Sequence, residues 1–402
     1  MKKTVKDLTD IKGKKVLIRV DFNVPLDENS NITDDTRIRA ALPTINYLRE
    51  NGAKVIVVSH LGRPKGEVNE KYSLAPVAKR LSELINAPVS FLKDTVGSDA
   101  LLKDVNALTD GQVVLLENIR FYPAEEKPDK DPEFAKKLAK LADIYVNDAF
   151  GAAHRSHSST AVITKYVKPA VSGLLMEKEL NMLGKLLENP ERPFIAIIGG
   201  SKVSTKIGVL ENLLNKVDTL ILGGGMTYTF MKAQGYKIGN SIVEDDKLDV
   251  ARDLMKAAKE KKVGLVLAKD VVVADAFSND ANTKVVPSTD IPDGWEGIDI
   301  GPDTREEIRQ VVLKAKTILW NGPVGVFEID KFAGGTCAVA QNVADATKHG
   351  AVSILGGGDT VAAIDKFKIE PESYTHVSTG GGASLEFIEG KELPGVAALD
   401  DK

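Results

Sequence analysis

Residues 173–189 read GLLMEKELNMLGKLLEN, and this stretch decides how the chain is divided. Apolar side chains recur in it at spacings of four, three and four from Met176 to Leu187, which predicts an amphipathic helix. Pro190 ends this helix, because a residue that precedes proline is pushed out of the α region. One interpretation is an ordinary surface helix, and the other is a connection between two domains.

The composition of the chain changes across this helix. Of the 34 glycines, 7 lie before Gly173 and 27 lie from Gly173 onward, whereas 8 of the 12 arginines lie before it and 4 after. An arginine-rich half and a glycine-rich half therefore meet here, which favours the domain connection. We predict an N-terminal domain over residues 1–172, an interdomain helix over 173–189, a C-terminal domain over 190–378 and a C-terminal segment over 379–402.

Length, charge and cysteine usage limit the class of protein. The chain has 402 residues, 43% of them hydrophobic, and a formal net charge of −4, which argues against nucleic acid or an anionic membrane as the main partner. Aromatic residues make up only 5%, so base-stacking platforms are not expected. Cys337 is the only cysteine, which excludes an internal disulfide. No apolar run approaches ~18 residues and the first residues resemble no signal peptide, so we expect a cytoplasmic protein without a membrane span.

Strand-like and helix-like stretches alternate along the chain. The predicted strands are residues 15–21, 54–59, 112–116, 143–146, 194–198, 219–222, 264–268, 317–320 and 351–355. The main predicted helices between them are residues 37–50, 74–85, 133–141, 247–261 and 333–347. This alternation predicts an α/β fold with two doubly wound parallel-sheet (Rossmann-like) domains, joined by the helix and separated by a cleft. In open sheets of this kind, ligands bind beyond the carboxyl ends of the strands.

In the first half, arginines follow the predicted strands. Arg63, Arg120 and Arg155 lie a few residues after the second, third and fourth strands, and Arg37 opens the first helix. A guanidinium presents a planar fork of donors that matches carboxylate or phosphate oxygens. Several converging forks predict a small ligand with more than one anionic group.

Other polar residues in the same loops fit such a ligand. Histidines such as His60 add donors, and Asp21 and Asn23 could hold a hydroxyl group. A single arginine would more simply form a surface ion pair, and a structural role for His157 stays open beside a role in binding. The net negative charge of the chain argues against a groove that binds nucleic acid.

In the second half, the predicted strands end in glycine-rich turns. These turns begin at Gly199-Gly200-Ser201-Lys202, Gly223-Gly224-Gly225, Asn321-Gly322, Gly356-Gly357-Gly358-Asp359 and, near the end of the chain, Gly380-Gly381-Gly382. Glycine lets backbone amides approach a phosphate closely, and a helix that follows adds a favourable dipole. If a helix starts directly after Gly200, Lys202 and Lys206 would share one of its faces. Asp359 beside the phosphates would be a natural Mg²⁺ ligand.

Three classes of function remain for a chain with an anion site in one half and a phosphate site in the other. Phosphoryl transfer across a cleft fits both sites, because this reaction needs positioning and charge stabilisation more than covalent chemistry. A nicotinamide dehydrogenase would need a G-x-G-x-x-G followed by an acidic residue, and that pattern is missing. A binding protein without catalysis would bind nucleotide but would not turn it over.

The motifs at these loops resemble those of the phosphoglycerate kinase family. The matching stretches, in family order from Arg19 to Ser384, are RVDFNVP, SHLGRP, ENIRF, VNDAFGAAHRSHSS, IIGGSKVSTKI, LGGGM, WNGPVGVFE, LGGGDT and HVSTGGGAS. The resemblance implies a reversible, Mg²⁺-dependent transfer of a phosphoryl group between 1,3-bisphosphoglycerate and ADP, giving 3-phosphoglycerate and ATP in glycolysis. It also implies direct in-line transfer after domain closure, a C-terminal segment that returns to the N-terminal domain, and a monomer.

The resemblance assigns site residues as well. It implies that the N-terminal domain binds 3-phosphoglycerate through Asp21, Phe22, Asn23, Arg37, His60, Leu61, Gly62, Arg63, Arg120 and Arg155. It implies that the C-terminal domain binds ADP or ATP through Gly200, Lys202, Lys206, Gly225, Gly297, Asn321, Glu328, Gly357, Gly358, Asp359 and Thr360, with Mg²⁺ at Asp359. The catalytic residues it implies are Arg37, Lys202, Gly380, Gly381 and Gly382, with Lys202 and the helix start at Gly380–382 near the migrating phosphoryl group.

Overall fold

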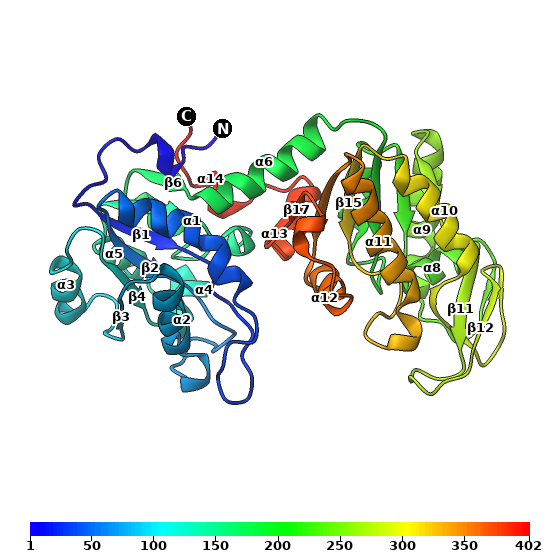
Figure 1. Cartoon of the computed structure of the whole chain (residues 1–402), viewed down its shortest axis with the longest axis horizontal. Helices are drawn as coiled ribbons and strands as arrows, with labels where there is room; N and C mark the ends of the chain where they lie inside the picture. The colour runs from blue at the N-terminus through cyan, green and yellow to red at the C-terminus, as the bar shows by residue number, and fades with distance from the viewer. The chain divides into compact units, whose positions relative to one another are not determined.

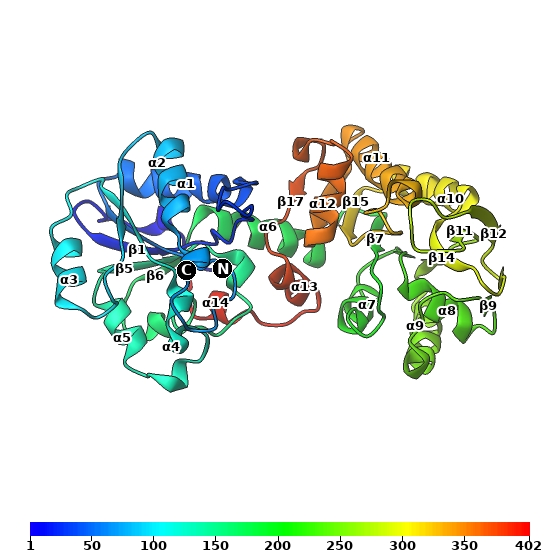
Figure 2. The same ribbon diagram turned by 90° about the horizontal axis from the view of Figure 1, so that it is seen from below.

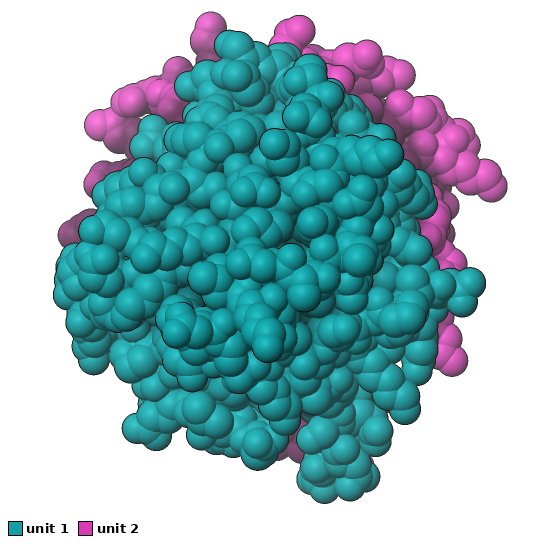
Figure 3. All heavy atoms as spheres, turned by 90° about the vertical axis from the view of Figure 1, so that its left-hand side faces the viewer, with its two compact units in different colours: residues 1–181, 392–402 teal, residues 182–391 magenta.

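The computed structural model describes all residues from Met1 to Lys402, and they form two compact units. Unit 1 comprises Met1–Asn181 and Glu392–Lys402, drawn in teal in Figure 3, and unit 2 comprises Met182–Lys391. Both units are built on parallel sheets, so the predicted α/β class is confirmed. The predicted domain boundaries and the cleft stay predictions.

A six-stranded parallel sheet of order β3-β4-β2-β1-β5-β6 forms the centre of unit 1. Its strands are β1 (Lys15–Arg19), β2 (Lys54–Val58), β3 (Val89–Leu92), β4 (Val113–Leu116), β5 (Ile144–Asn147) and β6 (Ala170–Ser172). The chain begins in the middle at β1, builds one side of the sheet and then returns to β5 on the other side. The strand order therefore reverses between β1 and β5, and such a switch point is where open α/β sheets bind ligands.

Helices cover both faces of this sheet (Figure 1). The helices of unit 1 are α1 (Thr36–Glu50), α2 (Ala75–Ile85), α3 (Asp99–Asn106), α4 (Pro123–Glu126), α5 (Phe134–Ala139) and α14 (Pro394–Ala397). Successive side chains of a strand point to opposite faces. Val16 and Ile18 accordingly pack in a cluster with residues of α1 and α2, whereas Leu17 packs in a second cluster with residues of α3 and α5. Burial of both faces explains why β1 is apolar at consecutive positions.

The two ends of the chain lie side by side in unit 1, as both ribbon views show (Figures 1 and 2). Lys2 forms an antiparallel bridge with Asp401, and its Nζ atom donates to the carbonyl oxygen of Leu399 at 2.8 Å. Farther along the C-terminal segment, the carbonyl oxygen of Gly395 accepts a hydrogen bond from Asn147 Nδ2 at 3.2 Å. The last residues are therefore attached to the end of β5.

Unit 2 has a second six-stranded parallel sheet, of order β10-β8-β7-β15-β16-β17. Its strands are β7 (Phe194–Ile198), β8 (Thr219–Leu222), β10 (Gly264–Val266), β15 (Thr317–Asn321), β16 (Val352–Gly356) and β17 (His376–Val377). The strand order reverses between β7 and β15, so this sheet also has a switch point.

Helices and two small sheets complete unit 2. The helices are α7 (Ile207–Leu213), α8 (Met226–Ala233), α9 (Leu248–Glu260), α10 (Pro302–Leu313), α11 (Gly334–Lys348), α12 (Gly358–Lys366) and α13 (Gly382–Ile388). The small sheets contain β11 (Asp270–Ala274), β12 (Thr283–Pro287) and β14 (Glu296–Ile300) in one, and β9 (Lys237–Ile238) and β13 (Asp290–Ile291) in the other. One large apolar cluster joins Ile195 and Trp320 of the main sheet to residues of α8, α10, α11 and α12.

Helix α6 (Leu174–Glu188) contains the last residues of unit 1 and the first residues of unit 2. Its first turn is secured within unit 1, because the amide of Leu174 donates to Thr44 Oγ1 at 2.9 Å and the amide of Met176 donates to Asp148 Oδ1 at 3.0 Å. These bonds supply acceptors for amide groups that have no partner inside the helix. No helix of the chain has the length and apolar character needed to cross a membrane.

Candidate functional site

At the carboxyl edge of the unit 1 sheet, the loops after β1 and β2 meet the start of α1. Arg37 Nη1 donates to the two carboxylate oxygens of Asp21 at 3.1 and 3.2 Å and to the carbonyl oxygen of Asn23 at 3.2 Å. The side-chain oxygen of Asn23 in turn accepts a hydrogen bond from the amide of Gly62 at 2.8 Å. The structure thus brings together four of the residues that the sequence predicts for the anion site.

The loop after β4 joins this group. Arg120 Nη1 donates to the carbonyl oxygen of Gly62 at 3.0 Å, and its Nε atom lies 3.6 Å from Glu126 Oε1. Phe22 and Leu61 are buried in the apolar core of unit 1, so only their backbone can face a ligand.

Two of the predicted arginines have guanidinium groups without a partner in the protein. Arg63 and Arg155 are exposed, and the structure shows no ion pair or hydrogen bond for either guanidinium group. In contrast, Arg37 is already paired with Asp21 and Arg120 with a backbone carbonyl. A ligand with two anionic groups would find unpaired donors at Arg63 and Arg155.

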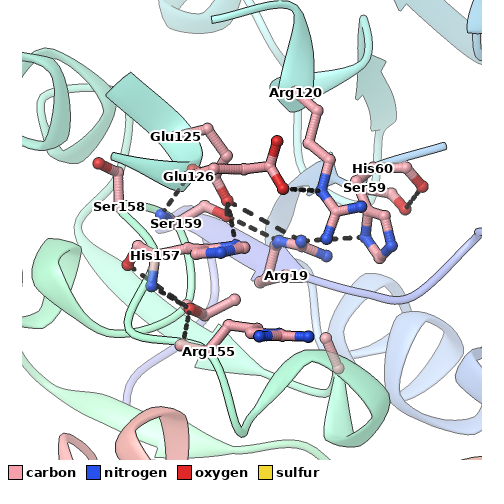
Figure 4. A network of polar contacts seen from close by, with 12 residues as sticks. Arg19, Ser59, His60, Arg120, Glu125, Glu126, Arg155, His157, Ser158 and Ser159 are labelled. Atoms are coloured by element: carbon pink, nitrogen blue, oxygen red, sulfur yellow. Dashed lines mark hydrogen bonds and ion pairs between the residues drawn. The ribbon is translucent and has the colours of Figure 1, made fainter. Parts of the chain in front are cut away.

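The end of β1 carries a further arginine with a different environment, shown in Figure 4. Arg19 is completely buried, and its Nε atom donates to Ser159 Oγ at 2.7 Å. Its Nη2 atom lies 3.2 Å from His60 Nδ1 and 4.0 Å from Glu125 Oε1. Ser159 also donates to both carboxylate oxygens of Glu125, through Oγ at 2.6 Å and through its amide at 2.9 Å. Arg19 therefore has no free donor face for a ligand.

This buried network has almost no signature in the sequence. Glu125 follows a proline in a short acidic helix, a context typical of an exposed residue, yet its side chain is fully buried. The one available signal was the position of Arg19 at the end of an apolar strand, where a charge must be paired if the strand is buried on both faces.

Burial and charge set the protonation of these groups. Burial lowers the pKa of His60 well below its usual value; Asp21 opposes this shift, and Arg19, Arg120 and Arg37 add to it. Burial and neighbouring cations, Arg120 foremost, lower the pKa of His157 to about 3. Burial alone would raise the pKa of Asp21, but the positive charge around it, including Arg37, lowers the value below the usual range. At neutral pH the site thus has neutral histidines and an ionised Asp21.

At the carboxyl edge of the unit 2 sheet, glycine-rich loops pass close to one another. A Cβ atom on Gly199 would lie 2.0 Å from the carbonyl oxygen of Pro323, so no other residue fits at this crossing. Beside it, Lys206 Nζ donates to Asn321 Oδ1 at 2.9 Å. Burial lowers the pKa of Lys206, and Asp359 opposes this shift. Asn321 Nδ2 is buried without a partner, so a donor remains available at this edge.

Lys202 and Lys206 do not share a helix face, because no helix begins directly after Gly200. Helix α7 begins only at Ile207, and the preceding residues form turns in which the amide of Lys206 donates to the carbonyl oxygen of Val203 at 2.9 Å. The backbone amide and the hydroxyl group of Ser204 both donate to the carboxylate of Glu244. Lys202 is exposed, and its amino group has no partner.

The loop between β16 and α12 contains the predicted residues from Gly357 to Thr360. Gly357 has a φ of +89°, and Gly358 and Asp359 form the exposed first turn of α12. Thr360 is buried, and its hydroxyl oxygen accepts a hydrogen bond from the amide of Gly322 at 2.7 Å, so it fixes the neighbouring loop. Glu328 is exposed, and its backbone oxygen accepts from Lys366 of α12 at 2.9 Å.

Gly225 and Gly297 lie in closely packed backbone around α8, Gly225 just before the helix and Gly297 in β14. A Cβ atom on Gly297 would lie 2.2 Å from the ring of Tyr228, and the amide of Gly297 donates to Ser241 Oγ at 2.8 Å. A Cβ atom on Gly225 would lie 2.8 Å from Ile242, the residue after Ser241. The predicted Gly380–382 turn precedes α13, which begins at Gly382, and Gly381 has a φ of +50°.

A divalent cation fits this edge only with ligands from a bound phosphate. The structure contains no cluster of three or more acidic, histidine or cysteine groups that could hold a metal ion. Mg²⁺, however, is commonly held by one or two carboxylates together with substrate phosphates and water. The exposed carboxylate of Asp359, in the first turn of α12, meets that requirement.

A family model, curated relatives and solved structures all match this chain to the same family. The family model described as "Phosphoglycerate kinase" matches residues 5–391. The chain is 59% identical to the cytosolic phosphoglycerate kinase of Nicotiana tabacum, over 100% of this chain and 99% of the relative, and 60% identical to the phosphoglycerate kinase of Synechococcus elongatus over the same shares. Among solved structures, phosphoglycerate kinase from Coxiella burnetii superposes with a TM-score of 0.89 at 46% identity, covering 99% of this chain and 98% of the other.

Proposed function

The chain belongs to the phosphoglycerate kinase family and is a kinase, and from this premise we propose that it transfers a phosphoryl group reversibly between 1,3-bisphosphoglycerate and Mg-ADP. The products in the glycolytic direction are 3-phosphoglycerate and ATP. The observation that carries the substrate assignment is the pair of unpaired guanidinium groups, Arg63 in the loop after β2 and Arg155 in the loop after β5. Together they suit a small ligand with a phosphate and a carboxylate.

In unit 1, the proposed roles follow from which donors are free. Arg63 and Arg155 would bind the phosphate that is not transferred, since their guanidinium groups have no other partner. Arg37 would lie closest to the reacting carboxyl group and would stabilise the charge of the migrating phosphoryl group. Asp21 and Asn23 orient Arg37 for this task.

In unit 2, the glycine-rich loops would bind the nucleotide. Gly200, Gly225 and Gly297 would face it with backbone, while Lys206 would neutralise phosphate charge. Lys202, whose amino group is unpaired, would accompany the migrating phosphoryl group together with the start of α13. Asp359 would hold Mg²⁺, which supplies positive charge to the nucleotide phosphates.

The reaction requires no proton transfer by the protein. In the glycolytic direction, the bond between phosphorus and the acyl oxygen breaks, and an oxygen of the ADP β-phosphate forms the new bond. The attacking oxygen is already ionised, and the leaving group departs as a carboxylate. The residues therefore need only to position the two substrates in line and to balance negative charge. We further propose that the protein acts as a monomer in the cytoplasm, after closure of its two domains.

A coupled assay with 3-phosphoglycerate and Mg-ATP tests this proposal. ADP release should require 3-phosphoglycerate, should stop when EDTA removes Mg²⁺, and should fall strongly in Lys202→Ala. A matched control is Lys216→Ala, which removes a side-chain ammonium group after α7, away from the glycine-rich loops. Binding of ATP without any turnover in the presence of 3-phosphoglycerate would support a binding protein and contradict the proposal.

A further inference from the structure

All three nitrogen atoms of the Arg19 guanidinium group have partners inside unit 1. Besides the bond from Nε to Ser159 and a short bond from Nη1 to the carbonyl oxygen of Val20, its Nη2 atom faces His60 Nδ1 at 3.2 Å. Figure 4 shows the guanidinium group between the His60 ring and Glu125. Every polar neighbour of Arg19 must therefore act as an acceptor toward it.

This contact decides where the proton of His60 lies. A guanidinium group has five N–H donors and no acceptor, so His60 Nδ1 can form this bond only when it is unprotonated. The single ring proton must then lie on Nε2, which is 4.0 Å from Asp21 Oδ1 and faces the anion site. We propose that Arg19 is a positioning residue that holds His60 as the neutral Nε2–H tautomer and so keeps a hydrogen-bond donor directed into that site.

The charges that face His60 also favour its neutral form. Arg19, Arg120 and Arg37 surround the ring with positive charge, and Asp21 opposes them. A second proton on the ring would place an N–H group against Arg19 and would add a charge in a buried environment. The other neutral tautomer would turn a lone pair toward the carboxylate of Asp21, which can only accept when it is ionised.

Glu125 and Ser159 hold Arg19 in place. Glu125 is the acidic partner of Arg19 in this buried environment, and Ser159 bridges the two by accepting from Arg19 Nε and donating to Glu125. Without a partner, a buried guanidinium group would be strongly unfavourable. The network thus fixes a charge that binds no ligand and uses it to orient a histidine that faces the site.

Nitrogen NMR of the ¹⁵N-labelled chain tests the tautomer directly. The His60 signals are assigned by their loss in His60→Gln. Between about pH 6 and pH 8, where an ordinary histidine titrates, His60 should show an unprotonated Nδ1, a protonated Nε2 and no titration. A protonated Nδ1, or an imidazolium that forms in this range, would overturn the proposal. This measurement does not depend on catalysis, so it stands even if the chain proves to have no kinase activity.

The variant Arg19→Lys tests the cause. It keeps a positive charge for Glu125 but lacks the planar fork, so His60 should become a mixture of tautomers. If the proposed function holds, KM for 3-phosphoglycerate should rise about tenfold while kcat changes less, because a donor to an anionic substrate is lost. The matched control is Arg49→Lys. In the unchanged chain, the guanidinium group of Arg49 donates to the carbonyl oxygen of Ile85 at 2.7 Å. A His60 pattern unchanged in folded Arg19→Lys would contradict the assignment of this role to Arg19.

Discussion

Two arginines near the start of the chain show how environment decides the use of the same side chain. Arg19 is 0% exposed and satisfied by protein groups, whereas the side chain of Arg37 is 36% exposed and bonds to Asp21 and to the Asn23 carbonyl oxygen through Nη1 alone. A buried, paired cation can orient its neighbours but cannot bind a ligand, while a partly exposed one can do so. In the sequence, only the position of Arg19 at the end of an apolar strand hints at the difference.

We predict that Arg37→Ala impairs the chemical step more than substrate binding. Removing one preoriented charge contact to the transition state should lower kcat by about 10²–10³, that is by roughly 2.7–4 kcal/mol. The control is Arg39→Ala in the same helix, because Arg39 Nε donates to Asp35 at 2.8 Å and not to the residues of the anion site. Steady-state kinetics with 3-phosphoglycerate measures both variants, and a near-normal kcat with a raised KM would assign Arg37 to substrate binding instead.

We expect Gly297→Ala to disturb unit 2 through packing. Its Cβ atom would overlap the ring of Tyr228, which is buried, so the unit should lose about 1–3 kcal/mol of stability and bind nucleotide more weakly. Gly184→Ala is the control, because a Cβ atom there meets nothing within 4 Å and alanine favours the helix. Thermal unfolding and calorimetric titration with ATP measure the two effects. Equal stability of Gly297→Ala and the unchanged chain would show that Tyr228 can move aside.

At the scale of elements, the start of α6 depends on a buried carboxylate. Burial raises the pKa of Asp148 to about 6, although hydrogen bonds such as the one from the Met176 amide act in the opposite direction. The unfolded value is about 3.9, so the folded state holds this proton more tightly. The contribution to stability is then fully present below about pH 4 and is lost as the pH rises through about 6, by about 3 kcal/mol in all.

The variant Asp148→Asn should remove this titration and keep an acceptor for Met176. We expect the free energy of unfolding of the unchanged chain, relative to the variant, to fall by about 2 kcal/mol between about pH 4 and pH 7. Urea unfolding at several pH values measures this difference, in which the titration of all other groups cancels. Parallel pH profiles for the two proteins would mean that Asp148 has an ordinary pKa in the folded chain.

A second test at this scale concerns the middle of α6. Leu183 is 1% exposed, so Leu183→Ala should cost about 2–5 kcal/mol of stability. We expect kcat to fall, because the helix joins the two units, while the separate binding of each ligand changes little. Lys178→Ala, an exposed position of the same helix, is the control. Weaker binding of one ligand alone would show that the effect stays within one unit.

The main parallel strands and the helices between them were accessible from the sequence. β7 begins and ends where its apolar run does, because a strand buried on both faces is apolar at consecutive positions, and β8 is apolar after its first residue, Thr219. The exposed strand β12 was missed, since its residues TKVVP have no alternation strong enough to identify it. β3 was missed for a similar reason, as none of its residues is fully buried.

For the two candidate sites, the sequence indicated which loops form them but not which side chains contact each other. Gly-rich turns and arginines mark the strand ends, yet the bond between Lys206 and Asn321 joins residues that are 115 positions apart and only the fold brings them together. Whether a helix begins directly after Gly200 was left open, because no local pattern reveals the bond between Ser204 and Glu244. Long-range side-chain pairs of this kind determine the details of both sites.

At the scale of the whole molecule, the proposed reaction divides its substrates between unit 1 and unit 2. Each ligand can shift an equilibrium only by its differential affinity for the closed form, so we expect both ligands to be needed for full closure. Small-angle scattering should therefore give a clearly smaller radius of gyration with 3-phosphoglycerate and nucleotide together than with either alone. Arg37→Ala serves as a control that should close when both ligands saturate it but should turn over slowly. An equal radius of gyration in all states at saturating ligand would mean that closure is not part of the cycle, and that α6 does not act as a hinge.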